Sequence, residues 1–107
     1  MAKANVDAGI CGYQATVEAT SLNGREVRVE ICSDCDMITA LNEDLAQLQW
    51  KGKGHEVFRR MTESAVYESA TRHIRHCACI VPAAVLKTVE VETGMALPKK
   101  ATIEFEE

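Results

Sequence analysis

The sequence predicts a small α+β domain in which a β-hairpin, three helices and a final strand follow one another in the order ββαααβ. Residues 13–20 and 27–31 alternate between apolar and polar side chains, which is the period of half-buried strands. Between residues 38 and 89, apolar residues recur at the spacings of three and four that are typical of helices. Residues 101–105 alternate again, so we expect a three-stranded sheet packed on one face by the helices.

The register of the hairpin follows from its apolar pattern. A two-residue turn would place Val17 opposite Glu30 and mix the apolar and polar faces of the sheet. We therefore predict a three-residue loop over residues 22–24, with Gly24 in the left-handed conformation. This loop places Val17 opposite Val29 and keeps every apolar side chain on one face.

Three helices are predicted after the hairpin. The first begins near Asp34, where Ser33-Asp34-Cys35-Asp36 fits a capping box, and its buried positions are Ile38, Leu41, Leu45 and Leu48. The second is capped by Thr62, and its apolar stripe consists of Val66, Ala70, Ile74 and Cys77. The third has Pro82 in its first turn and ends at Gly94.

Length and charge restrict the function. The 107 residues predict a single domain over 1–107, and a net charge of -4 with scattered basic residues argues against nucleic acid as a partner. The basic stretch Lys51–His55 lacks the spacing of a phosphate-binding loop, so we expect a solvated loop. We expect a cytoplasmic protein without a membrane segment, because no signal-peptide core or spanning apolar stretch is present.

Five cysteines are the most informative residues: Cys11, Cys32, Cys35, Cys77 and Cys79. In a reducing cytoplasm they indicate metal binding or thiol chemistry rather than structural disulfides. In the predicted hairpin register, Cys11 comes opposite Cys35 at the open end of the ladder. Cys32 falls on the polar face with Arg28 and Glu30, so we place it outside any shared site.

Two cysteines are expected at the starts of helices. Cys35 lies in the first turn of the first helix and Cys79 lies just before the third, where unpaired N–H groups favour thiolate over thiol. If these helices begin at one edge of the sheet, zinc or an iron–sulfur cluster would be bound by Cys11, Cys35, Cys77 and Cys79. His73 or His76 is an alternative to Cys77 as the fourth ligand, although a buried cysteine can also serve as a simple core residue.

Four motifs together resemble a small family of uncharacterised prokaryotic proteins, over nearly the whole chain. They are Ala8-Gly9-Ile10-Cys11-Gly12, Ser33-Asp34-Cys35, Cys79-Ile80-Val81-Pro82 and Ala96-Leu97-Pro98-Lys99. The resemblance implies that Cys11, Cys35 and Cys79 belong to the family's motifs, whereas Cys32 and Cys77 fall outside them. The chain is also similar, more loosely, to the small Cys-x-x-Cys scaffold domains of iron–sulfur assembly.

We therefore predict a carrier, scaffold or sensor that binds a metal ion or iron–sulfur centre, rather than an enzyme. One alternative is a thiol-based redox enzyme or switch that uses Cys35 or Cys79. Another is a structural interaction domain whose free cysteines only pack. The expected partner is another protein or a second copy of the chain, because a three-stranded sheet leaves an open edge.

Overall fold

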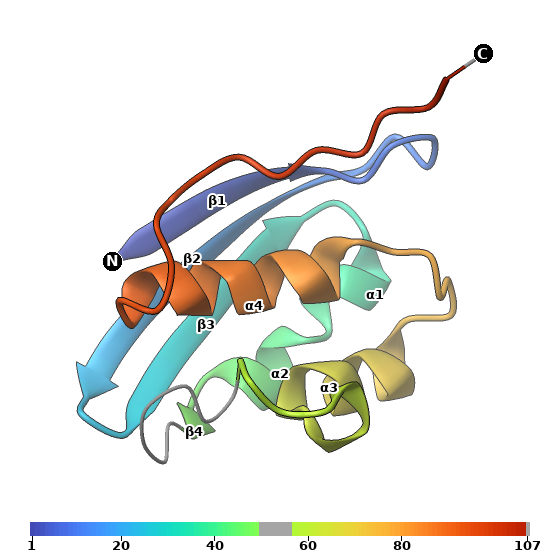
Figure 1. The fold of residues 1–107 in the computed structure, drawn as a ribbon. Coiled ribbons are helices and arrows are strands. Elements are labelled where there is room, and N and C mark those ends of the chain that lie inside the picture. The colour runs from blue at the N-terminus through green and yellow to red at the C-terminus, as the bar shows by residue number, and fades with distance from the viewer. Residues whose placement is uncertain (50–56, 107) are drawn as a thin grey trace.

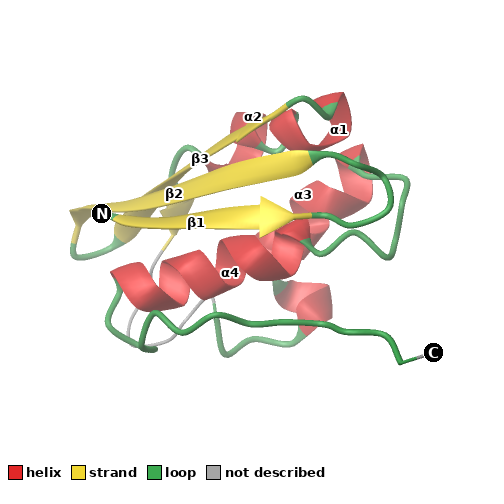
Figure 2. Ribbon diagram, turned by 90° about the horizontal axis from the view of Figure 1, so that it is seen from above, coloured by secondary structure: helices red, strands yellow, loops and turns green. Residues whose placement is uncertain are grey.

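The computed structural model describes residues 1–49 and 57–106, and within them an antiparallel sheet is covered by helices on one face (Figures 1 and 2). Its strands, in spatial order, are β1 (Ala2–Asp7), β2 (Gln14–Asn23), β3 (Glu26–Ser33) and β4 (Leu48–Gln49). The helices are α1 (Asp36–Thr39), α2 (Asn42–Leu45), the 3-10 helix η1 (Met61–Glu63), α3 (Ala65–His73) and α4 (Val81–Glu92).

The prediction of a three-stranded sheet in ββαααβ order is wrong, although the mixed α+β class holds. The sheet gains β1, whose core-facing residues Ala2, Ala4 and Val6 include only one large side chain and gave a weak strand signal. The predicted final strand over residues 101–105 is not formed. This segment is exposed and joins no strand of the described chain.

The hairpin register differs from the prediction by two residues. Val17 pairs with Ile31 instead of Val29, and the turn falls at residues 24–25, with a bulge on β2 just before it. Gly24 is not in the left-handed conformation. A shift by two leaves each side chain on its predicted face, so the apolar residues Val17, Val29 and Ile31 are all buried.

The predicted first helix is divided into two short ones. Its four predicted apolar positions are buried, but α1 ends at Thr39, α2 begins at Asn42 and Leu48 belongs to β4. The predicted capping box is also wrong, because the hydroxyl of Ser33 accepts a hydrogen bond from the N–H of Cys35 rather than from that of Asp36.

The two longer helices begin close to where they were predicted. Ser64, rather than Thr62, caps α3 by accepting hydrogen bonds from the N–H groups of Val66 and Tyr67 at 3.2 and 3.3 Å. The third predicted helix is confirmed as α4, with Pro82 in its first turn and Gly94 at a φ of 77° just beyond its end. In the described part of the chain, no helix is long and apolar enough to span a bilayer.

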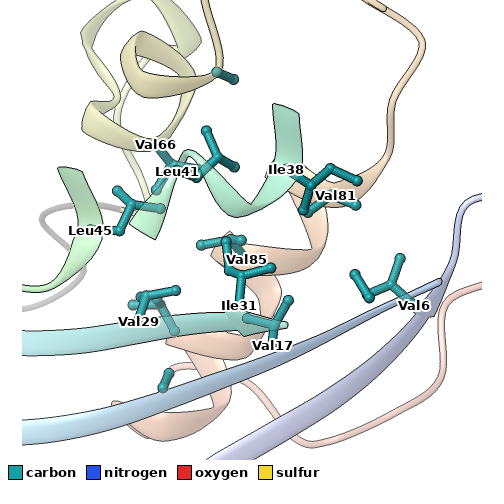
Figure 3. Packing of buried hydrophobic residues seen from close by; sticks show 14 of the residues in the cluster. Val6, Val17, Val29, Ile31, Ile38, Leu41, Leu45, Val66, Val81 and Val85 are labelled. Carbon is teal, nitrogen blue, oxygen red and sulfur yellow. The ribbon is translucent and has the colours of Figure 1, made fainter. Parts of the chain in front are cut away.

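One apolar cluster joins the helices to the sheet (Figure 3). α4 packs across β1 and β2, while α1 and α2 pack on β3. Leu41 and Leu45 are wholly buried between the helices and the sheet, and valines fill most of the remaining volume. The helix-covered face therefore forms the core, and the other face of the sheet stays polar.

The outer edge of β3 is covered in part by a side chain. The amide Oδ1 of Asn42 accepts a hydrogen bond from the N–H of Ile31 at 2.8 Å, and its Nδ2 donates one to the C=O of Ile31 at 2.8 Å. The Asn42 amide thus stands in for a neighbouring strand beside Ile31. Further along the same edge, β4 pairs with Glu26 and Val27.

Asn42→Ala is expected to reduce the free energy of unfolding by about 2 kcal/mol, because it leaves two partly buried backbone groups without partners. Urea unfolding measures the change. Gln47→Ala, at an exposed residue nearby, is the control and should change stability by less than about 0.5 kcal/mol. Equal effects of the two substitutions would show that the Asn42 amide does not stabilise the edge.

Candidate functional site

Three segments that carry cysteines reach the same end of the sheet (Figures 1 and 2). They are the loop over residues 8–13 between β1 and β2, residues 34–35 between β3 and α1, and the loop over residues 74–80 between α3 and α4. We call this region the cysteine end. All three segments are connections between regular elements, so the topology of the fold brings them together.

Cys11 lies at the corner of a tight turn. The N–H of Gly12 donates to the C=O of Gly9 at 2.9 Å, and Ile10 and Cys11 occupy the two corner positions. Both glycines have positive φ angles, 88° for Gly9 and 80° for Gly12, which other residues rarely adopt. The turn presents Cys11 and a fully exposed Ile10 to solvent.

Cys35 is fixed between the sheet and α1. Its side chain is buried in the apolar cluster, and its N–H donates to the hydroxyl of Ser33 at 3.2 Å. That hydroxyl in turn donates to the C=O of Gln14 on β2 at 2.8 Å. The C=O of Cys35 accepts the first hydrogen bonds of α1. Cys35 is therefore held on both sides.

The loop after α3 carries Cys77 and Cys79. The N–H of Cys79 donates to the C=O of His76 at 3.0 Å, which closes a turn with Cys77 at its corner. Cys79 is half-buried against the apolar cluster, whereas Cys77 is exposed. The predicted position of Cys77 on an apolar helical stripe is wrong, because α3 ends at His73.

The cysteines share one end of the sheet but are not gathered into a cluster. Ala15 pairs with Ser33, and this register does not bring Cys11 opposite Cys35, so that predicted pairing is wrong. Over residues 1–49 and 57–106, no three Cys, His, Asp or Glu side chains lie close enough together to hold a metal ion. Cys35 and Cys79 both contact the same apolar cluster.

Cys32 faces the other way. It pairs with Thr16 across the hairpin and is exposed. The prediction that Cys32 shares the polar face with Arg28 and Glu30 is confirmed, since these three exposed residues alternate with buried ones along β3. All three line one shallow groove, which extends to Asn42 and Ala46. A second groove on that face is also lined by Thr16 and Cys32.

A polar cluster between α2 and α3 was not predicted. Asp44 accepts a hydrogen bond from the hydroxyl of Ser69 at 2.7 Å, pairs with Arg72 at 3.1 Å and lies 2.9 Å from Nε2 of His73. The hydrogen bond from Ser69, followed by those from Arg72 and His73, lowers the pKa of the Asp44 carboxyl despite partial desolvation. The one-turn spacing of Ser69 and His73 on α3 was the sequence signal that could have revealed it.

This cluster lacks the geometry of a nucleophilic triad. Ser69 is wholly buried and gives its hydrogen bond to Asp44 rather than to His73, so no base is placed to activate its hydroxyl. The cluster therefore joins α2 to α3. Because it engages His73, His76 remains as the exposed histidine of the loop before α4. The basic stretch Lys51–His55 lies outside the described residues.

Comparisons with known proteins bear on the whole chain. The model of a family described as a family of unknown function (DUF6951) matches residues 2–105. No curated protein and no solved structure matches the sequence.

Proposed function

Since the chain belongs to the family of unknown function DUF6951, we propose its function from the cysteine end: the protein binds zinc or an iron–sulfur centre there. The ligands in this proposal are Cys11, Cys35 and Cys79, with Cys77 as the fourth. The protein then acts as a metal carrier, scaffold or sensor in a reducing cytoplasm. Its partner is another protein or a second copy of the chain.

One observation carries the proposal. Three cysteine-carrying segments that are distant in sequence reach one end of the sheet, while Cys32 lies on its polar face. Cys35 is the fixed member, held by Ser33 and by the first turn of α1. Cys11 and Cys77 stand at exposed turn corners. Metal binding would supply the free energy that brings these turns onto Cys35 and Cys79.

The chemistry of the side chains fits this role. Thiolates are soft ligands that favour zinc and iron–sulfur clusters, and four of them complete a tetrahedral zinc site. The apolar surroundings of Cys35 and Cys79 would limit the access of water to the bound metal. If a nitrogen ligand replaces Cys77, His76 is the better choice because His73 already contacts Asp44.

Metal analysis and an absorption spectrum of anaerobically purified protein test the proposal. We expect near-stoichiometric zinc, or iron with thiolate-to-iron absorption bands. Cys79→Ser should remove most of the metal, because it deletes a ligand. Cys32→Ser is the matched control and should retain the full content, since Cys32 faces away from the site. Absence of both metals, or equal losses in the two variants, would contradict the proposal.

A redox switch is the second candidate, favoured by the contact of Cys35 and Cys79 with one apolar cluster. In this function, the two thiols lose two protons and two electrons to hydrogen peroxide, which is reduced to water, and a disulfide forms. Peptide mapping of peroxide-treated, metal-free protein would detect a Cys35–Cys79 linkage. If no cysteine substitution changes anything except stability, the remaining alternative is an interaction domain with packed cysteines.

A further inference from the structure

The two edges of the sheet are unlike. The outer edge of β3 is covered by β4 at Glu26 and Val27 and by the side chain of Asn42 at Ile31. The outer edge of β1, in contrast, has no neighbouring strand among the described residues. An unpaired edge is a template for another strand, and β1 is six residues long.

The direction of the backbone groups along β1 follows from the ladder. Ile31 turns both its N–H and its C=O toward Asn42, away from β2, and this direction alternates along each antiparallel strand. We follow this alternation from β3 through the paired residues of β2 to β1. The N–H and C=O groups of the even-numbered residues of β1 then point toward β2. The outward N–H and C=O groups therefore belong to Lys3, Asn5 and Asp7.

The segment after α4 has the pattern of a strand but no partner strand among the residues that the structure describes. Residues 100–106 are exposed, and no hydrogen bond joins them to any part of the chain that the structure describes. Ile103 and Phe105 are 71% and 92% exposed. Large apolar side chains that alternate with polar ones, in a segment without a partner, indicate a strand that pairs outside its own molecule.

We infer that residues 100–105 of one copy pair antiparallel with β1 of a second copy, and that the second copy returns the same pairing. Charge fixes the register. With Ile103 opposite Ala4, Glu104 comes opposite Lys3 and Lys100 comes opposite Asp7. Shifting the register by two residues in either direction removes at least one of these opposite-charge pairs. Pairs of this kind directly opposite each other stabilise a sheet.

The apolar side chains are complementary in the same register. Ala2 and Ala4 are small residues on the helix-covered face of β1. They come opposite the large Phe105 and Ile103, while the larger Val6 comes opposite Ala101. Each pairing therefore sets a large side chain beside a small one, so the two exposed apolar residues are covered on the side where α4 already packs on β1.

The direction of the C-terminal segment favours pairing with β1 of a second molecule over pairing with β1 of its own. In Figures 1 and 2 the C-terminal segment runs in the same direction as β1, so pairing within one molecule would be parallel. The parallel register that keeps Ile103 beside Ala4 sets Glu106 beside Asp7 and loses both opposite-charge pairs. The antiparallel register is available when the segment comes from a second copy.

Sedimentation velocity from low to high micromolar concentration tests this pairing. The full chain should form a concentration-dependent dimer, and a variant that ends at Lys99 should be monomeric. The truncated protein should keep its unfolding midpoint, measured at concentrations where the full chain is monomeric, because the deleted residues make no hydrogen bond to the described chain. Hydrogen exchange should show protection of Lys3, Asn5 and Asp7 only in the dimer.

A charge exchange tests the register. Lys3→Glu and Glu104→Lys should each raise the dimer dissociation constant about tenfold, because each places like charges opposite one another twice in the dimer. The double variant should restore the dimer. Glu43→Lys, the same charge change at an exposed site on α2, should have no effect. A monomeric full chain, a dimer that survives truncation, or a double variant no tighter than the single ones would each overturn the pairing.

Discussion

Leu41→Ala is expected to lower the free energy of unfolding by about 3 kcal/mol. Leu41 is wholly buried at the junction between α1 and α2, where it contacts the cluster shared by the sheet and the helices. Alanine would leave a cavity there, because the regular elements around Leu41 can close only partly over the missing atoms. Urea unfolding should show a lower midpoint with an unchanged dependence on denaturant.

Leu97→Ala provides the control for this experiment. It removes the same atoms, but Leu97 is 87% exposed and lies before the segment proposed to pair. Its expected effect is below about 0.5 kcal/mol. Similar losses for the two variants would mean that Leu41 does not occupy the core in the way the structure describes.

Asp44→Ala is expected to lower the free energy of unfolding by about 2 kcal/mol at neutral pH. It leaves the buried hydroxyl of Ser69 without its acceptor and removes the partner of Arg72 and His73. Asp44→Asn keeps an acceptor oxygen for Ser69 but loses the charge, so it should cost less than the alanine variant. Thermal unfolding at pH 7 ranks the two.

The Asp44 cluster also predicts how stability changes with pH. The folded pKa of Asp44 lies below the ordinary carboxyl value of about 3.9, so the unfolded chain binds the proton more tightly. The charge of Asp44 therefore contributes fully to the free energy of unfolding above the ordinary carboxyl pKa. This contribution is lost as the pH falls through the folded pKa. Asp44→Asn should remove this loss, and the stability difference from wild type should shrink on acidification.

Glu43→Gln is the matched control for the pH experiment. Glu43 is an exposed carboxylate on the same short helix, next to Asp44. Glu43→Gln should lose stability on acidification to the same extent as the wild type. Glu92, whose pKa is lowered chiefly by a hydrogen bond from the N–H of Ser21, retains its own acid-dependent contribution in every variant. If Asp44→Asn and wild type lose stability in parallel, the cluster is not responsible.

The sequence predicted which side chains of each strand and helix are buried better than it predicted where these elements begin and end. Alternation placed Val17 and Ile31 in the core correctly, because an error of two residues in register preserves the face. The break between α1 and α2 was missed, and the amide of Asn42, the first residue of α2, contacts Ile31 on β3. Local patterns do not contain that contact. β1 was missed because Ala2 and Ala4 carry little hydrophobic signal.

The candidate site was predictable to the level of topology. Cys11 was predicted at the open end of the hairpin, Cys35 in the first turn of a helix and Cys79 just before another helix. The segments that carry them reach one end of the sheet, and a shared site stays a prediction. The position of Cys77 depended on where α3 ends, and helix ends are poorly marked when an apolar residue such as Ile74 continues the period. The cluster around Asp44 required the packing of two helices and was beyond a local pattern.

The unequal edges of the sheet also make polymerisation self-limiting. Fibril growth requires molecules with two free edges, so that each added strand exposes another. Here β4 and the amide of Asn42 occupy one side at Glu26, Val27 and Ile31. In the reciprocal dimer, the β1 edge and the C-terminal segment of each copy are both engaged, so neither is left to recruit a third copy. An exposed edge strand is thereby compatible with a closed dimer instead of an open polymer.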